Sequence, residues 1–85
     1  MPVSVIIRYY GRFAERTGRA EEPLEVDSEI AKAYQAVAAH LAANYKIQPP
    51  YNIIINEKHL MGAIKLKMLL QDGDVFHVLP FMSGG

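Results

Sequence analysis

Apolar side chains recur along the chain in two rhythms, every second residue in short runs and every third or fourth residue in one long run. Residues 3–10 alternate in this way and are rich in β-branched and aromatic side chains, which predicts a strand. Shorter runs of the same kind predict strands at residues 23–26, 51–55 and 75–79. Residues 13–18 have the composition of a helical turn stopped by a glycine. We therefore expect an opening β-hairpin with a long connection.

One amphipathic helix is the clearest element of the pattern, and we expect it at about residues 28–45. Its apolar positions are spaced three and four residues apart and form one stripe: Ile30, Ala33, Tyr34, Val37 and Leu41. Asp27 or Ser28 is expected to cap its N-terminus, with Glu29 near the positive end of the helix dipole. Alanines favour the helix, and the prolines at residues 49–50 prevent its continuation.

The remaining segments complete the order of elements. Residues 56–59 are typical of a tight turn, and the residues from Leu60 onward predict a short return strand. Asp72, Gly73 and Asp74 form a turn signal before the last strand. Strands that flank one helix in this way predict a two-layer α+β domain with the helix packed across one face of a sheet.

Length and charge narrow the class of protein. A chain of 85 residues has room for one domain with a modest core and none for a separate catalytic domain. Nine basic residues balance nine acidic ones, so no net field draws the protein to nucleic acid or to an anionic membrane. Cysteine is absent, which removes disulfides and fits a reducing compartment. No apolar run approaches the roughly 20 residues that span a bilayer. We therefore expect a cytoplasmic protein without nucleic-acid or membrane partners.

The polar residues form no recognisable catalytic, metal or cofactor site. His40, His59 and His77 fall on different predicted elements without metal-ligand spacing, so surface or structural roles are favoured. Asp72 and Asp74 lack the other ligands of a calcium loop, so a turn is favoured over a cation site. The glycines form no phosphate-binding loop. We therefore expect no metal, no bound cofactor and no enzyme site.

The glycine pair at residues 84 and 85 is the most informative local feature. A carboxylate that must thread a narrow channel into another active site needs neighbours without side chains, and glycine allows that close approach. The alternative is a frayed end without a role. Residues 80–85, extended at about 3.3–3.6 Å per residue, reach about 20 Å, which is enough to enter a partner's pocket. The carboxylate of Gly85 is therefore the candidate functional group.

Several apolar residues near the last strand lack an obvious internal partner. A single helix covers only one face of a sheet, so apolar side chains on the other face need another explanation. Core positions and a docking surface are both open for these residues: Tyr10, Phe13, Phe76, Leu79, Phe81 and Met82. We expect some of them to form a docking surface.

Three stretches carry a family resemblance that covers essentially the whole chain. Residues 9–18 resemble a first-strand exit with an aromatic residue, a small residue, Arg, an apolar residue and a closing Gly. Residues 70–75 resemble a Leu-x-Asp-Gly-Asp turn, and residues 80–85 an ending in which a proline segment precedes Ser/Thr-Gly-Gly. All three are found in the MoaD/ThiS family of ubiquitin-like sulfur carriers, and the chain most resembles its molybdopterin synthase small subunits (MoaD). Phe81 departs from a frequent second proline, and His77 from a frequent apolar residue.

The resemblance implies a fold and a division of the chain. It implies a β-grasp, ubiquitin-like fold with a mixed sheet of four to five strands and one main helix on one face. Residues 1–79 would form this domain, and residues 80–85 would form a flexible tail that carries sulfur. The protein would be a carrier rather than an enzyme.

The resemblance also implies partners and site residues. In the family, a MoeB/ThiF-like activating enzyme uses ATP to adenylate the terminal carboxylate, here that of Gly85. A sulfur donor protein then displaces AMP and leaves a thiocarboxylate, which delivers sulfur to a MoaE-like large subunit in molybdenum cofactor biosynthesis. Gly84 would let the tail pass. Tyr10, Leu79 and Phe81 fall where the family makes partner contacts, and no cofactor would remain bound to the carrier.

Other functions remain open at this point. A sulfur carrier for thiamine, tungsten-cofactor or amino-acid biosynthesis would look similar. A protein modifier joined to lysines through Gly85 shares the fold, the tail and the activation. A plain interaction module is less favoured, and a stand-alone enzyme least, because no acid, base, metal and nucleophile converge in the sequence.

Overall fold

The computed structural model describes residues 1–81. Within them, five strands and three helices alternate in a single α+β domain. The elements are β1 (Pro2–Tyr9), α1 (Arg12–Thr17), β2 (Glu21–Asp27), α2 (Ile30–Tyr45), β3 (Tyr51–Ile55), β4 (Lys58–His59), α3 (Leu60–Lys65) and β5 (Val75–Pro80). None of the helices in this part of the chain is long and apolar enough to cross a bilayer.

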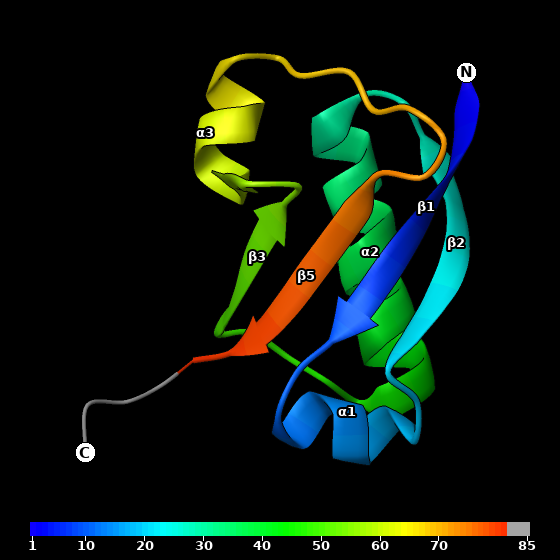
Figure 1. Ribbon diagram of the computed structural model, residues 1–85, viewed down its shortest axis with the longest axis vertical. Coiled ribbons are helices and arrows are strands. Elements are labelled where there is room, and N and C mark those ends of the chain that lie inside the picture. The colour runs from blue at the N-terminus through cyan, green and yellow to red at the C-terminus, as the bar shows by residue number, and fades with distance from the viewer. Residues whose placement is uncertain (82–85) are drawn as a thin grey trace.

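The strands form one mixed sheet in the order β2-β1-β5-β3-β4 (Figure 1). β1 pairs antiparallel with β2, as the predicted hairpin requires, and parallel with β5. On its other side, β5 pairs antiparallel with β3. The first and last strands therefore lie side by side in the middle of the sheet. Because β5 is held between two partners, its position fixes where the chain leaves the domain.

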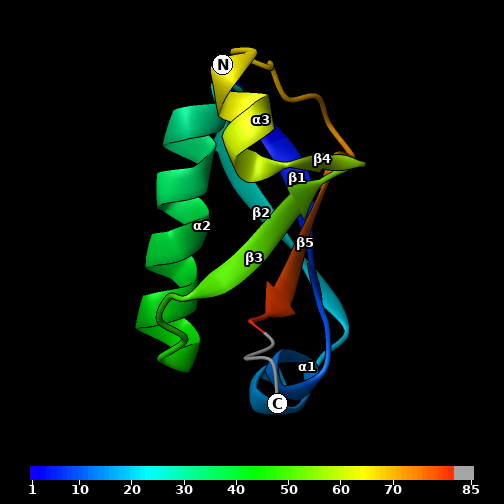
Figure 2. The ribbon, with the colours of Figure 1, turned by 90° about the vertical axis from the view of Figure 1, so that its left-hand side faces the viewer.

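The main helix covers one face of this sheet (Figure 2), as predicted. The buried side chains of α2 are those of the apolar stripe, with Tyr34 half-buried at its edge: Ile30, Ala33, Val37 and Leu41. Alternate strand residues meet this stripe and are fully buried: Val5, Ile7, Ile55, Phe76 and Val78. Removing each such side chain from water stabilises the fold by about 1.5–3 kcal/mol.

The prediction of a return strand from Leu60 onward is wrong. The antiparallel partner of β3 is limited to Lys58 and His59, and residues 60–65 form α3 instead. Leu60, Ala63 and Ile64 are spaced three and four residues apart, so one side of a helix carries all three against the core. A short apolar run fits a strand or a helix equally well by composition, and tertiary packing decides between them here.

The predicted N-terminal cap of the main helix is also wrong. α2 begins at Ile30, and Glu29 occupies the cap position without a side-chain cap hydrogen bond. The Asp27 carboxylate accepts a hydrogen bond from the Glu29 amide at 2.8 Å, which makes a turn before the helix. Ser28 is held by backbone hydrogen bonds to Met1 and Leu70. β2 accordingly extends to Asp27, beyond its expected end at residue 26.

The turn predicted at residues 72–74 is confirmed, and its two carboxylates bind the backbone. Asp72 Oδ1 accepts a hydrogen bond from the Ser4 amide at 2.8 Å. Asp74 Oδ2 accepts one from the Gln71 amide at 2.9 Å. Gly73 has a φ of 90°, which a residue with a side chain rarely adopts. These contacts attach the loop before β5 to β1.

Candidate functional site

Tyr10 and Leu79, two of the residues predicted to contact partners, lie together on the side of the sheet opposite α2. Side chains on this side alternate with the buried ones along β1 and β5. Tyr10 and Leu79 line one shallow depression there with Ile54, Asn56 and His77. We call this surface the open face. Among residues 1–81 no helix packs across it, as Figure 2 shows.

His77 stands at the centre of the open face. Its Nδ1 atom lies 2.6 Å from the Tyr10 hydroxyl, and the two ring centroids are 5.7 Å apart. Burial lowers the pKa of His77 below its ordinary value of 6.5, and the positive charge of Arg8 lowers it further. The ring is therefore neutral at pH 7. A neutral, hydrogen-bonded imidazole costs less free energy to bury against a partner than a charged one. His77 is therefore compatible with an apolar contact at this surface.

The edge of the open face toward β2 is polar. Arg8 is the cross-strand neighbour of His77, and its guanidinium lies 2.9 Å from the carboxylate of Glu21. The two side chains are 44% and 46% exposed, so solvent screens this ion pair and it contributes little to stability. Apolar contact area on the open face is thus concentrated over β5 and β3.

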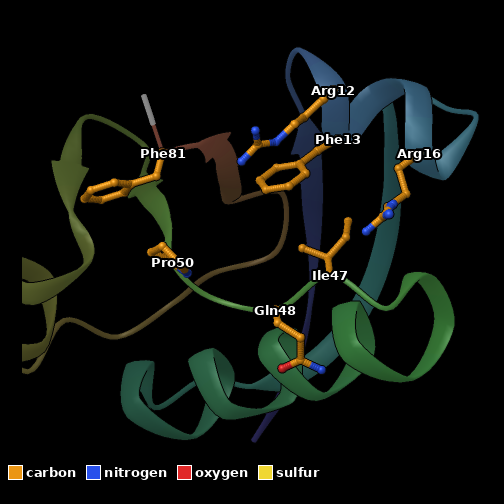
Figure 3. A pocket seen from close by; sticks show the side chains of 7 residues that line it. All are labelled: Arg12, Phe13, Arg16, Ile47, Gln48, Pro50 and Phe81. Atoms are coloured by element: carbon orange, nitrogen blue, oxygen red, sulfur yellow. The ribbon is translucent and has the colours of Figure 1, made fainter. Parts of the chain in front are cut away.

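Phe81, the third predicted partner-binding residue, lies apart from Tyr10 and Leu79. Phe81 is half-exposed and is one of the residues that line a separate cavity of about 600 Å³ (Figure 3). The cavity lies between α1, the segment after α2, and the end of β5. Its lining residues are Arg12, Phe13, Arg16, Ile47, Gln48, Pro50 and Phe81. We call it the tail-exit cavity, because Phe81 is the last residue described before the glycine pair.

A close approach between α1 and β5 fixes the position of the tail-exit cavity. Gly11 precedes α1 with φ 55° and ψ −132°, a conformation available essentially to glycine. A Cβ atom on Gly11 would lie 3.4 Å from Cγ of Pro80. Two residues later, the ring of Phe13 packs edge-on against Tyr51 with centroids 6.3 Å apart. These contacts attach α1 to the end of β5 and to β3.

The sequence profile of the ThiS family matches residues 7–85, nearly the whole chain. The chain belongs to the ThiS family. This family, which includes the MoaD proteins, consists of small ubiquitin-like sulfur carriers rather than catalysts. Its members work with activating enzymes and synthase partners. No curated protein sequence matches the chain.

Solved structures confirm the ubiquitin-like β-grasp fold of this ThiS-family chain. The Haloferax volcanii HVO 2177 protein is 22% identical with a TM-score of 0.72, over 99% of this chain and 88% of its own. The small archaeal modifier protein 1 from Methanosarcina acetivorans is 22% identical with a TM-score of 0.69, over 100% and 99%. A proposed molybdopterin converting factor, subunit 1, from Pyrococcus furiosus is 20% identical with a TM-score of 0.67, over 94% and 99%. At these identities the likeness concerns the fold.

The apolar residues singled out in this ThiS-family sequence divide into core and surface. Phe13 and Phe76 are core residues, with 6% and 0% of their surface exposed, and Phe13 also lines the tail-exit cavity. Tyr10 and Leu79 are half-buried on the open face, and Phe81 is 50% exposed at the tail-exit cavity. Met82 and the two glycines of the tail, Gly84 and Gly85, lie outside the described residues.

A buried polar cluster surrounds Glu22, a residue that the sequence patterns did not single out. Tyr9 donates a short hydrogen bond to its carboxylate, Tyr45 donates another at 2.7 Å, and His40 Nε2 lies at 3.1 Å. Burial raises the pKa of Glu22, but these hydrogen bonds outweigh it and hold the pKa below 4.5. The cluster connects β1, β2 and α2. It makes His40 a structural histidine, as expected from the sequence.

Proposed function

We propose that this chain is a sulfur carrier whose working group is the carboxylate of Gly85. The observation that carries the proposal is the family match, which extends through the glycine pair to residue 85. The fold supports it, because β5 lies in the centre of the sheet and delivers the chain to the exit at Phe81. A rigid domain with a thin tail can present one terminal atom to successive enzymes.

The chemistry proposed for Gly85 needs an activating partner. A free carboxylate resists attack by nucleophiles, so an activating enzyme first transfers AMP to it from ATP and releases pyrophosphate. Hydrosulfide, supplied by a sulfur donor, then attacks the carbonyl carbon, AMP leaves with one carboxylate oxygen, and the proton on sulfur is lost to solvent. The resulting thiocarboxylate is a soft nucleophile that stays attached to the protein. Gly84 has no side chain to obstruct the tail in either active site.

The acceptor that we propose is the precursor of molybdopterin. Support comes from the proline and Ser-Gly-Gly ending of residues 80–85 and from the similar fold of the Pyrococcus furiosus protein. In this role the chain is the small subunit of molybdopterin synthase. A MoaE-like large subunit would contact the open face through Tyr10 and Leu79, with Phe81 at the entrance of the tail.

Protein modification is a second candidate function, and a specific observation favours it. Two of the structural neighbours are small archaeal modifier proteins, with TM-scores of 0.69 and 0.64. A lysine amine of a target protein can attack the same adenylated carbonyl, and the product is an isopeptide bond. Both candidates share the activation of Gly85 and differ only in the nucleophile that follows.

Intact mass spectrometry tests the proposal. The purified chain is incubated with ATP, the activating enzyme of its host and a sulfur donor. We expect a mass increase that corresponds to one oxygen exchanged for one sulfur, and no such increase for the chain that lacks Gly85. An unchanged mass with demonstrably active enzyme would refute the carrier. Isopeptide-linked products in the presence of host proteins would favour the modifier.

A further inference from the structure

We propose that the tail-exit cavity is a docking groove for an acidic segment of the activating enzyme. In this groove, carboxylates of the enzyme bind Arg12 and Arg16, and an apolar side chain between them packs on the floor. The inference rests on the proposed activation of Gly85. Figure 3 shows the arrangement, with Arg12 and Arg16 extending from α1 above Phe13 and Ile47.

The two arginines supply positive charge that the domain does not neutralise. They are four residues apart on α1, so they project from neighbouring turns of one helix. Arg8 and Arg19 bind the carboxylates of Glu21 and Glu22, whereas neither Arg12 nor Arg16 forms an ion pair within residues 1–81. Arg16 makes one long hydrogen bond, of 3.4 Å, to the carbonyl oxygen of Lys46. The planar guanidinium groups are well suited to bidentate binding of carboxylates.

The floor of the groove is apolar and already ordered. Phe13 and Ile47 are 6% and 1% exposed, while Pro50 and Phe81 form an exposed rim. The guanidinium of Arg12 lies 5.6 Å from the centre of the Phe13 ring, so the aromatic face holds it in place. A cavity of about 600 Å³ accepts one or two side chains of a partner. Positive walls and an apolar floor together select a segment that combines carboxylates with an aliphatic or aromatic residue.

The length of the tail favours the activating enzyme as the partner that occupies the groove. Four residues follow Phe81 in the sequence, and they extend by about 13–14 Å at 3.3–3.6 Å per residue. An enzyme that adenylates Gly85 therefore brings its surface to within that distance of Phe81, a residue that lines the groove. Activation is common to the carrier and the modifier, so the inference does not depend on the final acceptor. Opposite charges near the exit also increase the rate of encounter.

Steady-state adenylation kinetics test the groove. Pyrophosphate release is measured at increasing concentrations of the carrier, with the activating enzyme of its host. We expect Arg12→Ala to raise KM about tenfold, and the double change Arg12→Glu and Arg16→Glu to raise it at least about 100-fold, with kcat unchanged. Added salt should raise the wild-type KM and have little effect on the double variant.

A matched control separates local contacts from net charge. Lys58→Glu and Lys65→Glu make the same charge change at exposed positions of β4 and α3, at the opposite end of the domain from α1 (Figure 1). We expect this double variant to change KM less than about threefold. Thermal unfolding of each variant verifies that the fold is retained.

Four results would overturn the inference. If the wild type is adenylated and the Arg12/Arg16 variant has an unchanged KM, the groove does not dock the enzyme, and the proposed function stands. If folded Arg12/Arg16 variants lose kcat without a change in KM, the arginines act after docking. If the wild type is not adenylated by active enzyme, the proposed function fails with the inference. Binding of ATP alone at Arg12 and Arg16, seen as chemical-shift changes, would make the cavity a small-anion site instead.

Discussion

Replacing Glu22 with glutamine removes the charge of the polar cluster and retains its shape. Glu22 is the buried carboxylate of the described domain, with 8% of its surface exposed. One of its oxygens accepts hydrogen bonds from Tyr9, Tyr45 and His40, and the other from Arg19 at 3.2 Å. The amide nitrogen of Asn44 lies 3.1 Å from His40 Nδ1, which leaves Nε2 as the donor to Glu22. The carboxylate on β2 is thus the common acceptor for donors from β1 and α2.

The expected loss is about 3 kcal/mol. A hydrogen bond to a charged group contributes about 1.5–3 kcal/mol and a neutral one about 0.5–1.5 kcal/mol, so each of the three bonds weakens by about 1 kcal/mol in Glu22→Gln. The ion pair with Arg19, whose side chain is 52% exposed, adds little. A domain of this size has a free energy of unfolding of about 4–13 kcal/mol, so the thermal midpoint should fall by roughly 12–24 °C.

Urea unfolding followed by circular dichroism measures this loss of stability. The pH dependence of the loss tests whether the charge of Glu22 causes it. The pKa of Glu22 is lower in the folded than in the unfolded state, so its stabilisation is present above pH 4.5 and is lost as the pH falls through the folded pKa. The difference in unfolding free energy between wild type and Glu22→Gln should therefore be fully present at neutral pH and shrink as the pH falls below 4.5.

Glu21→Gln is the control for this experiment. Its carboxylate is adjacent in sequence but 46% exposed, and it pairs with a half-exposed arginine. We expect Glu21→Gln to cost less than about 1 kcal/mol. If the free energy of unfolding of Glu22→Gln lies within about 0.5 kcal/mol of the wild-type value at neutral pH, the reasoning about the buried cluster is refuted.

Three further predictions concern the site. Gly11→Ala should lower the free energy of unfolding by about 1–3 kcal/mol, because φ of 55° and ψ of −132° strain any side chain; an unchanged urea midpoint would contradict this. NMR titration of His77 should give a midpoint below 6.5, which moves upward when Arg8 is replaced by Gln; a midpoint at or above 6.5 would contradict the lowered pKa of His77. Leu79→Lys should weaken binding to the proposed large synthase subunit by about tenfold in titration calorimetry. Its free energy of unfolding should fall by less than about 1 kcal/mol. An unchanged affinity would exclude the open face as the contact surface.

The long elements of the fold were predictable from the sequence, and the site was predictable only in part. The stripe on α2 spans several turns, so its period is unambiguous, whereas the run from Leu60 is too short to distinguish strand from helix. Tyr10 and Leu79 were identified through the family resemblance. Their position beside His77 depends on the parallel pairing of β1 with β5, which joins residues 67 positions apart.

Two features were beyond sequence reasoning because they depend on distant segments. The tail-exit cavity joins residues of α1, the segment after α2 and Phe81, and no local pattern connects them. Glu22 occupies an inward position of β2, in phase with Leu24 and Val26, and a carboxylate there is normally excluded from a core. The alternation of β2 placed Glu22 in the interior, and this was the available signal for a buried polar cluster.

The central claim is that sulfur resides on the carboxylate of Gly85, and the composition of the chain makes it directly measurable. Because the sequence contains no cysteine, a thiol-alkylating reagent at neutral pH has no thiol side chain to modify. The protein is purified from its host, alkylated and cleaved after Lys67, and the peptide of residues 68–85 is sequenced by mass spectrometry. We predict one sulfur and one alkyl group on Gly85, absent from cells that lack the activating enzyme. An unmodified Gly85 carboxylate, in cells where that enzyme is active and sulfur is supplied, would contradict the account.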